Sequence, residues 1–311
     1  MKPLDRRSFL KNSLLGATAV SLAGEEPLAS QTAAGGAPGA NPSEAPGIID
    51  TNVNLFNWPF RALKYRDTKA LVAKLKKHRV TEAWAGSFEA LLSKDMAGVN
   101  TRLADECRTQ APGFLIPFGS VNLAWPDWED DLRRCHEVHK MPGLRIYPGY
   151  QPFDLGHPAM ESLLKMTTER GLILQVVFGM EDPRVHHPII NVGPVILAPL
   201  LKAVKSTPNA SIELLHFPGS SRGADLSEFM TNTNTVMDIS QLEGNGAVGR
   251  MIGSITGLPS ARVPVERLVF GSHAPYFPVE TALLKLMESP LDAQQLRSIM
   301  QSNARRLLPR A

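Results

Sequence analysis

Short apolar runs alternate with longer amphipathic segments from residue 47 to the end of the chain. The runs are rich in β-branched residues, which is typical of buried strands, and the segments between them carry apolar residues at intervals of three to four, as on one face of a helix. The predicted strands are 48–54, 80–87, 114–122, 143–147, 172–178, 211–216, 235–240 and 267–272. Helical patterns lie between them, at 68–78, 98–110, 128–140, 158–171 and 193–206. Eight βα units in about 250 residues predict an α/β fold, a single-domain, distorted TIM (β/α)8 barrel. A doubly wound open sheet is the alternative if one or two of these runs are not strands.

The first 46 residues break this pattern. They begin with "MKPLDRRSFLKN", where Arg6 and Arg7 are adjacent, and continue with the apolar run "SLLGATAVSLAG" and a stretch rich in Gly, Ala, Ser and Pro. This order is typical of a twin-arginine-like export signal followed by a disordered linker. An amphipathic amino-terminal helix is the alternative. We therefore predict a leader and linker over 1–46, a barrel over 47–311, and a periplasmic location, with a membrane tether if the leader is not cleaved.

Charge and cysteine content restrict the partners. The net charge of +3 is small and does not point to nucleic acid. After the leader no apolar run is long enough to span a bilayer, so we expect no transmembrane domain in the mature chain. Cys107 and Cys135 lie on successive predicted helices, either as buried free thiols or as a disulfide, and their spacing does not support a metal site. A small-molecule substrate is therefore the expected partner, and the oligomeric state is left open.

Polar residues stand at the carboxyl ends of the predicted strands, which is where the catalytic residues of TIM barrels lie. These residues are Asn52, Asn54, Ser87, Ser120, Asn122, Arg145, Tyr147, His216, Ser240, Ser272 and His273. The fifth predicted strand is the exception, because it ends in Val176, Val177 and Phe178. The sequence therefore predicts a polar site at this end of the barrel.

Several of these strand ends resemble those of one family. "IIDTNVNLF", "GLRIYPGY", "SIELLHFPG" and "RLVFGSHAP" are similar to the first, fourth, sixth and eighth strands of the amidohydrolase-related proteins, and "NARRLLP" is similar to their terminal helix. Those proteins are metal-dependent TIM-barrel hydrolases and decarboxylases. The resemblance extends from residue 48 to residue 308.

The resemblance implies metal-ligand positions, and most of them carry other residues here. The two first-strand histidines fall on Asn52 and Asn54, the fifth-strand histidine on Val177, and the eighth-strand aspartate on His273; only His216 matches. Neutral amides are weak ligands for a transition metal. We therefore expect either no cofactor or one weakly held divalent metal, zinc or manganese, on His216, His273, Asn52 and Asn54.

Three side chains are candidates for catalysis. His216 and His273 should face the same barrel mouth, where one of them acts as general base, or both satisfy backbone groups only. Arg145 either clamps a substrate carboxylate or phosphate, or braces the barrel in a buried ion pair.

Five further residues are candidates for substrate binding: Asn52, Asn54, Tyr147, Trp58 and Ser272. The two amides would donate hydrogen bonds to a substrate oxygen that gains charge in the transition state. Trp58 either lines an apolar pocket wall or closes the core at the barrel rim, and Tyr147 is either a proton donor or rim packing. The long stretch after the fifth strand, "FGMEDPRVHHPIINVGP", suits a lid over the mouth.

These features together predict an amidohydrolase-related hydrolase with an altered, metal-poor or metal-free site. The substrate would be a small organic ester, lactone, amide or carboxylate, so that decarboxylation is also compatible. The alternative is a non-catalytic binding protein on the same barrel, which the valine at position 177 favours.

Overall fold

A computed structural model of the protein describes residues 47–182, 187, 189, 192–218, 226, 229–231, 233–253 and 263–310. The expected export signal and linker, and His186 of the expected lid, lie outside these residues. Residues Ala45–Ala311 form one compact unit. Within the described part of the chain, no helix is both long and apolar enough to cross a membrane.

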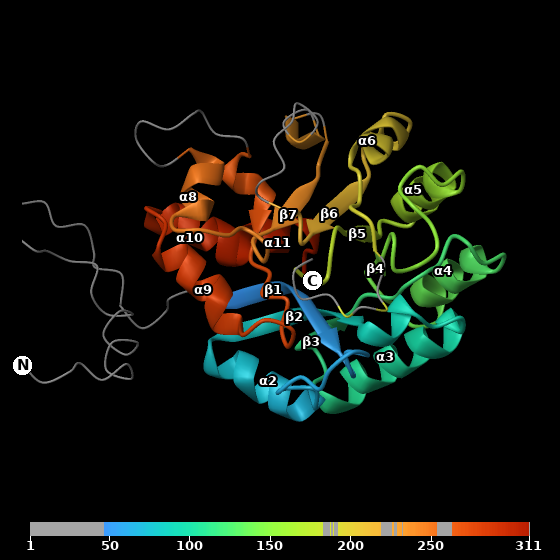
Figure 1. Cartoon of the computed structure of the whole chain (residues 1–311), viewed down its shortest axis with the longest axis horizontal. Helices are drawn as coiled ribbons and strands as arrows, with labels where there is room; N and C mark the ends of the chain where they lie inside the picture. The colour runs from blue at the N-terminus through green and yellow to red at the C-terminus, as the bar shows by residue number, and fades with distance from the viewer. Residues whose placement is uncertain are drawn as a thin grey trace, which may run out of the picture. The chain divides into compact units, whose positions relative to one another are not determined.

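Eight strands are present among the described residues, and all their pairings are parallel (Figure 1). They are β1 (Ile48–Leu55), β2 (Val80–Ser87), β3 (Leu115–Pro117), β4 (Gly143–Ile146), β5 (Ile173–Val177), β6 (Ser211–Leu215), β7 (Val236–Asp238) and β8 (Leu268–Val269). Each predicted strand is therefore confirmed, although several are shorter than predicted.

The strands form two sheets, ordered β1-β2-β3 and β4-β5-β6-β7-β8. Single parallel bridges join the two sheets, one between Gly119 and Leu144 and the other between Val53 and Ala274. The sheet therefore closes on itself, which confirms the TIM barrel and excludes the open sheet. The two seams with only one bridge each account for the distortion.

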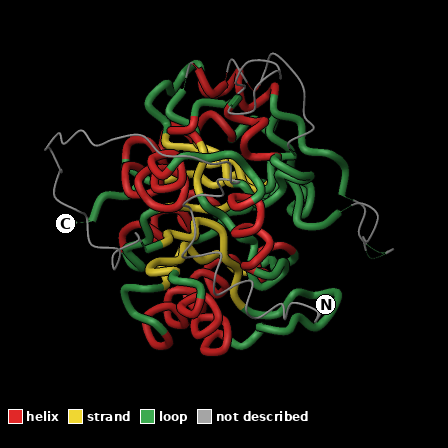
Figure 2. Tube along the Cα trace, turned by 90° about the vertical axis from the view of Figure 1, so that its left-hand side faces the viewer, coloured by secondary structure: helices red, strands yellow, loops and turns green. Residues whose placement is uncertain are grey.

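Helices surround the strands in the described part of the chain, as the red and yellow segments of Figure 2 show. The α-helices are α2 (Thr68–Lys77), α3 (Met96–Gln110), α4 (Trp128–Glu137), α5 (Met160–Glu169), α6 (Ala198–Val204), α8 (Ala247–Ile252), α9 (Val279–Met287), α10 (Ala293–Arg297) and α11 (Asn303–Leu307). Shorter turns are η1 (Phe88–Leu91), η3 (Val265–Arg267) and η4 (Ser298–Ser302). Aspartate side chains cap the amino ends of three of these helices: Asp67 accepts from the N–H of Ala70, Asp95 from that of Gly98, and Asp292 from that of Gln295.

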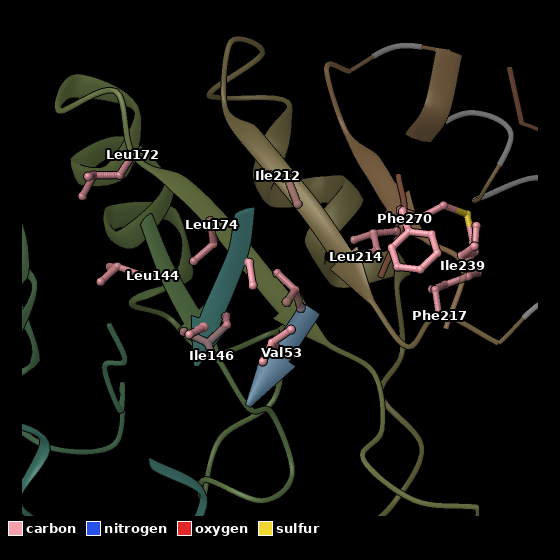
Figure 3. Packing of buried hydrophobic residues seen from close by; sticks show 14 of the residues in the cluster. Val53, Leu144, Ile146, Leu172, Leu174, Ile212, Leu214, Phe217, Ile239 and Phe270 are labelled. Carbon is pink, nitrogen blue, oxygen red and sulfur yellow. The ribbon is translucent and has the colours of Figure 1, made fainter. Parts of the chain in front are cut away.

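Alternate residues of each strand face opposite sides of the barrel wall. Leu144, Ile146, Ile212 and Leu214 belong to the large core that packs the strands against the helices (Figure 3). Cys107 and Cys135 belong to the same core as buried free thiols, so no disulfide joins them.

The inside of the barrel is layered. One apolar cluster includes Ile49, Ile173 and Val236 near the amino ends of their strands, and another includes Val177 and Leu215 at the carboxyl ends. Between these clusters the inward-facing residues are polar. This polar layer and the strand ends above it hold the candidate site.

Candidate functional site

The two histidines of the site sit at sharply bent strand ends. His216 follows β6 with φ 56°, and His273 follows β8 with φ 59°. This left-handed conformation is uncommon for residues other than glycine and persists only where neighbouring groups hold it. Here the N–H of His216 donates to Asp238 Oδ1 at 3.0 Å, and the N–H of His273 donates to the carbonyl of Asn52 at 2.8 Å. The backbone therefore fixes both rings at the carboxyl end of the barrel.

The two asparagines of β1 meet these rings. Asn52 Nδ2 donates to His216 Nε2 at 3.0 Å, and Asn54 Nδ2 donates to His273 Nδ1 at 3.3 Å. The centroids of the two imidazole rings lie 3.8 Å apart in an edge-on arrangement. All four side chains are buried. The structure therefore brings together the four residues that the sequence placed at one barrel mouth.

Both imidazoles are neutral. His273 Nε2 lies 2.9 Å from the carbonyl oxygen of Met180, which can only accept, so Nε2 carries the proton and Nδ1 presents its lone pair to Asn54. Burial lowers the pKa of His273 to about 3. Burial, and then the neighbouring His273, hold the pKa of His216 well below its ordinary value. The pair therefore stays unprotonated at neutral pH.

A carboxylate that the sequence analysis did not single out lies at the centre of this arrangement. Asp238, the last residue of β7, accepts from Ser240 Oγ at 3.0 Å and from Asn52 Nδ2 at 2.6 Å, in addition to the backbone of His216. A side chain at Gly271 would place its Cβ 2.6 Å from Asp238 Oδ2, so glycine is required there. The sequence did contain a signal for this residue, because Asp238 is an acid within the apolar run "TVMDIS". A carboxylate buried in such a strand needs hydrogen-bond partners, which indicates a polar site around it.

Arg145 is engaged entirely within the barrel. Its Nε donates to Gln175 Oε1 at 2.8 Å, and Nη1 donates to Asn54 Oδ1 at 2.9 Å. The remaining N–H groups point to the carbonyls of Val53, Thr51 and Trp84 at 3.0, 3.4 and 3.3 Å. A guanidinium has five N–H donors, and all five are used, so this arrangement leaves none for a substrate anion. Gly86 makes room for the group, because a Cβ there would lie 2.6 Å from Nη1.

Two further polar residues of this layer were missed from the sequence, Gln175 and Glu213. Gln175 Nε2 donates to Glu213 Oε2 at 2.7 Å and to the carbonyl of Thr51 at 2.9 Å. Burial raises the pKa of Glu213 to about 8. Both residues lie in the middle of predicted strands, where each is a single polar residue in an apolar run.

Two other expected binding residues, Tyr147 and Ser272, make their described side-chain hydrogen bonds to backbone groups near the site. Tyr147 is buried, and its hydroxyl donates to the carbonyl of Ser87 at 3.3 Å. Ser272 Oγ accepts from the N–H of Ala274 at 3.0 Å. Both hydrogen bonds stabilise the local backbone. The roles of Tyr147 and Ser272 in substrate binding stay predictions.

Aromatic side chains cover His273. Tyr276 stacks on its ring with centroids 4.9 Å apart, and Trp58 packs edge-on against Tyr276 at 5.2 Å. The Tyr276 hydroxyl donates to Glu181 Oε1 at 2.8 Å, which ties the segment after β5 to this cover. Val177 belongs to the same apolar cluster as Trp58. The buried His273 ring therefore lies against an aromatic cover made by Tyr276 and Trp58.

The donor set does not fit a resident divalent metal. The nitrogen lone pairs of His216 and His273 each face an amide N–H, whereas ligand lone pairs must face the ion. Val177 supplies no donor at the fifth-strand position. Within the described ranges, no group of three or more His, Cys, Asp or Glu side chains is arranged to hold a metal ion.

Comparisons with known proteins agree on the family. The family described as "Amidohydrolase" matches residues 50–310. No match was found among the curated proteins.

Solved structures of similar fold include several decarboxylases. A 2,6-dihydroxybenzoate decarboxylase from Rhizobium has a TM-score of 0.62 at 16% identity, covering 84% of this chain and 98% of its own. A 5-carboxyvanillate decarboxylase from Sphingomonas paucimobilis has a TM-score of 0.65 at 12% identity, covering 85% and 99%. A dihydroxybenzoic acid decarboxylase from a Polaromonas species, with bound manganese and the inhibitor 2-nitroresorcinol, has a TM-score of 0.63 at 13% identity, covering 85% and 98%. At these identities the likeness shows the fold, and the matched family shows that the chain belongs to the amidohydrolases.

Proposed function

We propose that this amidohydrolase-family protein is a hydrolase that cleaves a small organic ester, lactone or amide at the His216–His273 pair without a resident metal. The observation that carries the proposal is the orientation of the two asparagine amides, whose N–H groups occupy the side of each imidazole that a metal-dependent site would turn toward an ion.

The proposed base is His216. Asp238 Oδ1 accepts from the N–H of His216 and from Ser240 Oγ, and Ser240 Oγ lies 2.7 Å from His216 Nδ1, so an ionised Asp238 would stabilise an imidazolium formed at His216. His273 Nε2 instead faces the carbonyl of Met180, which is a neutral group. In the proposed reaction water displaces the Asn52 N–H from His216 Nε2, gives one proton to that nitrogen and attacks the carbonyl carbon, which forms a tetrahedral oxyanion. The oxyanion then collapses, the acyl C–O or C–N bond breaks, and His216 returns the proton to the leaving alkoxide or amine, so the acid and the alcohol or amine are released and the base is again neutral.

The proposed donor to the developing oxyanion is Asn54. Its Nδ2 uses one hydrogen on His273, and the other has no hydrogen-bond partner among the described residues. Arg145 holds Asn54 Oδ1 at 2.9 Å and so keeps the N–H side of the amide turned toward the mouth. A preorganised donor of this kind is worth roughly 10²–10³ in kcat.

The test is a hydrolysis screen on protein purified without chelators or metal-affinity resin, with elemental analysis of the same sample. Esters, lactones and amides of small acids form the panel, and release of carbon dioxide from aromatic carboxylates is measured alongside, because the structural neighbours are decarboxylases. His216→Asn is expected to lower kcat by about 10² or more. His139→Asn, on a half-buried histidine of the outer surface, is the matched control.

Activity that rises with a stoichiometric metal, or that survives His216→Asn, contradicts the proposal. Carbon dioxide release without hydrolysis would reassign the reaction while keeping the site.

The second candidate function is a binding protein that does not turn its ligand over. The complete use of Arg145 within the barrel and the apolar residue at position 177 favour it. Ligand binding by calorimetry, with no product over the same panel, would support this function in place of catalysis.

The location is part of the proposal as well. The twin-arginine-like leader supports export to the periplasm. Fractionation of cells expressing the full chain tests it, and Arg6→Lys with Arg7→Lys is expected to retain the protein inside the cell.

A further inference from the structure

We infer that Asp238 and Ser240 are positioning residues that hold His216 in the tautomer with its proton on Nδ1 and direct the Nε2 lone pair into the site. Their catalytic consequence rests on the proposed function, but the tautomer itself is a property of the resting protein. Neither residue occupies one of the positions at which the family resemblance implies a metal ligand.

The tautomer follows from counting hydrogens. His216 Nδ1 lies 2.7 Å from Ser240 Oγ, and Ser240 Oγ lies 3.0 Å from Asp238 Oδ1. A serine hydroxyl has one hydrogen, and an ionised carboxylate oxygen can only accept, so Ser240 donates that hydrogen to Asp238 Oδ1, which also accepts from the N–H of His216 at 3.0 Å. Ser240 Oγ can then only accept from the ring, so Nδ1 must carry the proton.

The other end of the ring gives the same answer. Asn52 Nδ2 lies 2.6 Å from Asp238 Oδ2 and 3.0 Å from His216 Nε2. If the amide were turned over, its carbonyl oxygen would face a carboxylate oxygen, which is repulsive. Asp238 therefore sets the amide so that an N–H faces Nε2, and Nε2 must carry the lone pair.

The four side chains thus close a ring of hydrogen bonds with one consistent direction: Asn52 to His216, His216 to Ser240, and Ser240 and Asn52 both to Asp238. Lys285 on α9 packs against the outside of this ring and donates to the carbonyls of Ile239 and Ser240, which fixes the backbone that carries the hydroxyl. All four side chains are buried, and each hydrogen bond of the ring joins two of them directly, so no water is needed to complete it.

Imidazole nitrogen NMR on protein with 15N-labelled histidine tests the inference directly. The chain has eight histidines, and His216 is assigned by loss of its signals in His216→Asn. The expected result is a neutral ring protonated on Nδ1. His273, with Nε2 donating to Met180, is the internal control and should show the opposite tautomer.

Three variants separate positioning from packing. In Ser240→Ala the Asn52 contact still favours the same tautomer, but the buried Nδ1 proton has lost its acceptor, so these opposing effects are expected to give a mixture of tautomers at His216. Ser240→Thr, which keeps a hydroxyl, is expected to restore the single tautomer. Asp238→Asn should disturb the ring more severely, and Ser240→Ala keeps the inference testable if that variant fails to fold. Thr167→Val, which removes a buried hydroxyl bonded to the carbonyls of Leu163 and Leu164, is the control and should leave His216 unchanged.

If hydrolysis is found, Ser240→Ala should lower kcat about tenfold with KM unchanged, and Ser240→Thr should recover it. A His216 ring protonated on Nε2 in the native protein overturns the inference, as does an unchanged single tautomer in Ser240→Ala. The expected tautomers without any turnover would uphold the positioning role and remove the proposed hydrolase.

Discussion

Glu213 gives the sharpest test of the electrostatics inside the barrel. Its side chain is fully buried, and its Oε2 accepts from Gln175 Nε2 at 2.7 Å. Burial raises its pKa from an ordinary 4.5 to about 8, against a smaller opposing effect of hydrogen bonds from Thr51 and Gln175. The substitution Glu213→Gln removes the ionisation and keeps an acceptor for Gln175.

The raised pKa makes stability depend on pH in a definite direction. Between pH 4.5 and pH 8 the folded protein keeps a proton on Glu213 that the unfolded chain has released. The contribution of this group is therefore complete below pH 4.5 and declines as the pH rises, by about 1.4 kcal/mol for each pH unit. Over the 1.5 units from pH 6.5 to pH 8, native protein should lose about 2 kcal/mol relative to Glu213→Gln. The histidines and Asp50 contribute equally to both proteins and cancel in this difference.

Urea unfolding at the two pH values measures the effect. We expect the free energy of unfolding of the native protein to fall more steeply between them than that of Glu213→Gln. Glu137→Gln, on the exposed face of α4, controls for the loss of a carboxylate and should keep the native slope. Parallel changes in native protein and Glu213→Gln would refute the reasoning, because Glu213 would then carry no proton that the unfolded chain lacks.

Three further outcomes follow from the same layer. Arg145→Met should lower the free energy of unfolding by about 3 kcal/mol or more, because it removes five buried hydrogen bonds and the only guanidinium found in the described barrel interior. Urea titration measures this loss, and Arg133→Met on the surface is the control that should have no measurable effect. Gly271→Ala should cost about 1–3 kcal/mol by overpacking, since its Cβ would lie 2.6 Å from the carboxylate of β7, and Gly179→Ala, with open space around it, serves as the control in thermal unfolding. If hydrolysis is found, kcat/KM should stay level as the pH falls through 6.5, because burial keeps the pKa of His216 well below that ordinary value and the base unprotonated; an acid limb centred near 6.5 would contradict this.

The barrel could be predicted because its signals are repeated along the chain. Each strand is an apolar run, and each is followed by a segment with helical periodicity, so an error at one boundary does not change the topology. The boundaries were less accurate where backbone chemistry decides them. The third strand, predicted over 114–122, ends at Pro117, which has no N–H for the ladder.

The site could be predicted only in part, for a related reason. Polar residues at strand ends are conspicuous, and the strand-end rule found Asn52, Asn54, His216 and His273 together. Gln175, Glu213 and Asp238 lie inside predicted strands and not at the strand ends, so the strand-end rule did not identify them as site residues. Their partners come from strands distant in the sequence, and the sequence alone does not show which of them meet.

Asparagine fits positions 52 and 54 of β1, where the family resemblance implies histidine, because of the direction of the hydrogen bonds. A metal-binding site needs lone pairs that converge on a positive ion, and imidazoles provide them. An amide provides N–H groups, which need lone pairs to face them, and the described site supplies these on His216, His273 and Asp238. The amide N–H groups of Asn52 and Asn54 therefore face the imidazole lone pairs, which is where a metal ion would lie in a metal-binding site. The Asp238 carboxylate holds the Asn52 amide in that orientation. Exchanging one asparagine for histidine would leave Asp238 or Arg145 facing a group of the wrong kind, so the first-strand residues and the buried polar layer must change together.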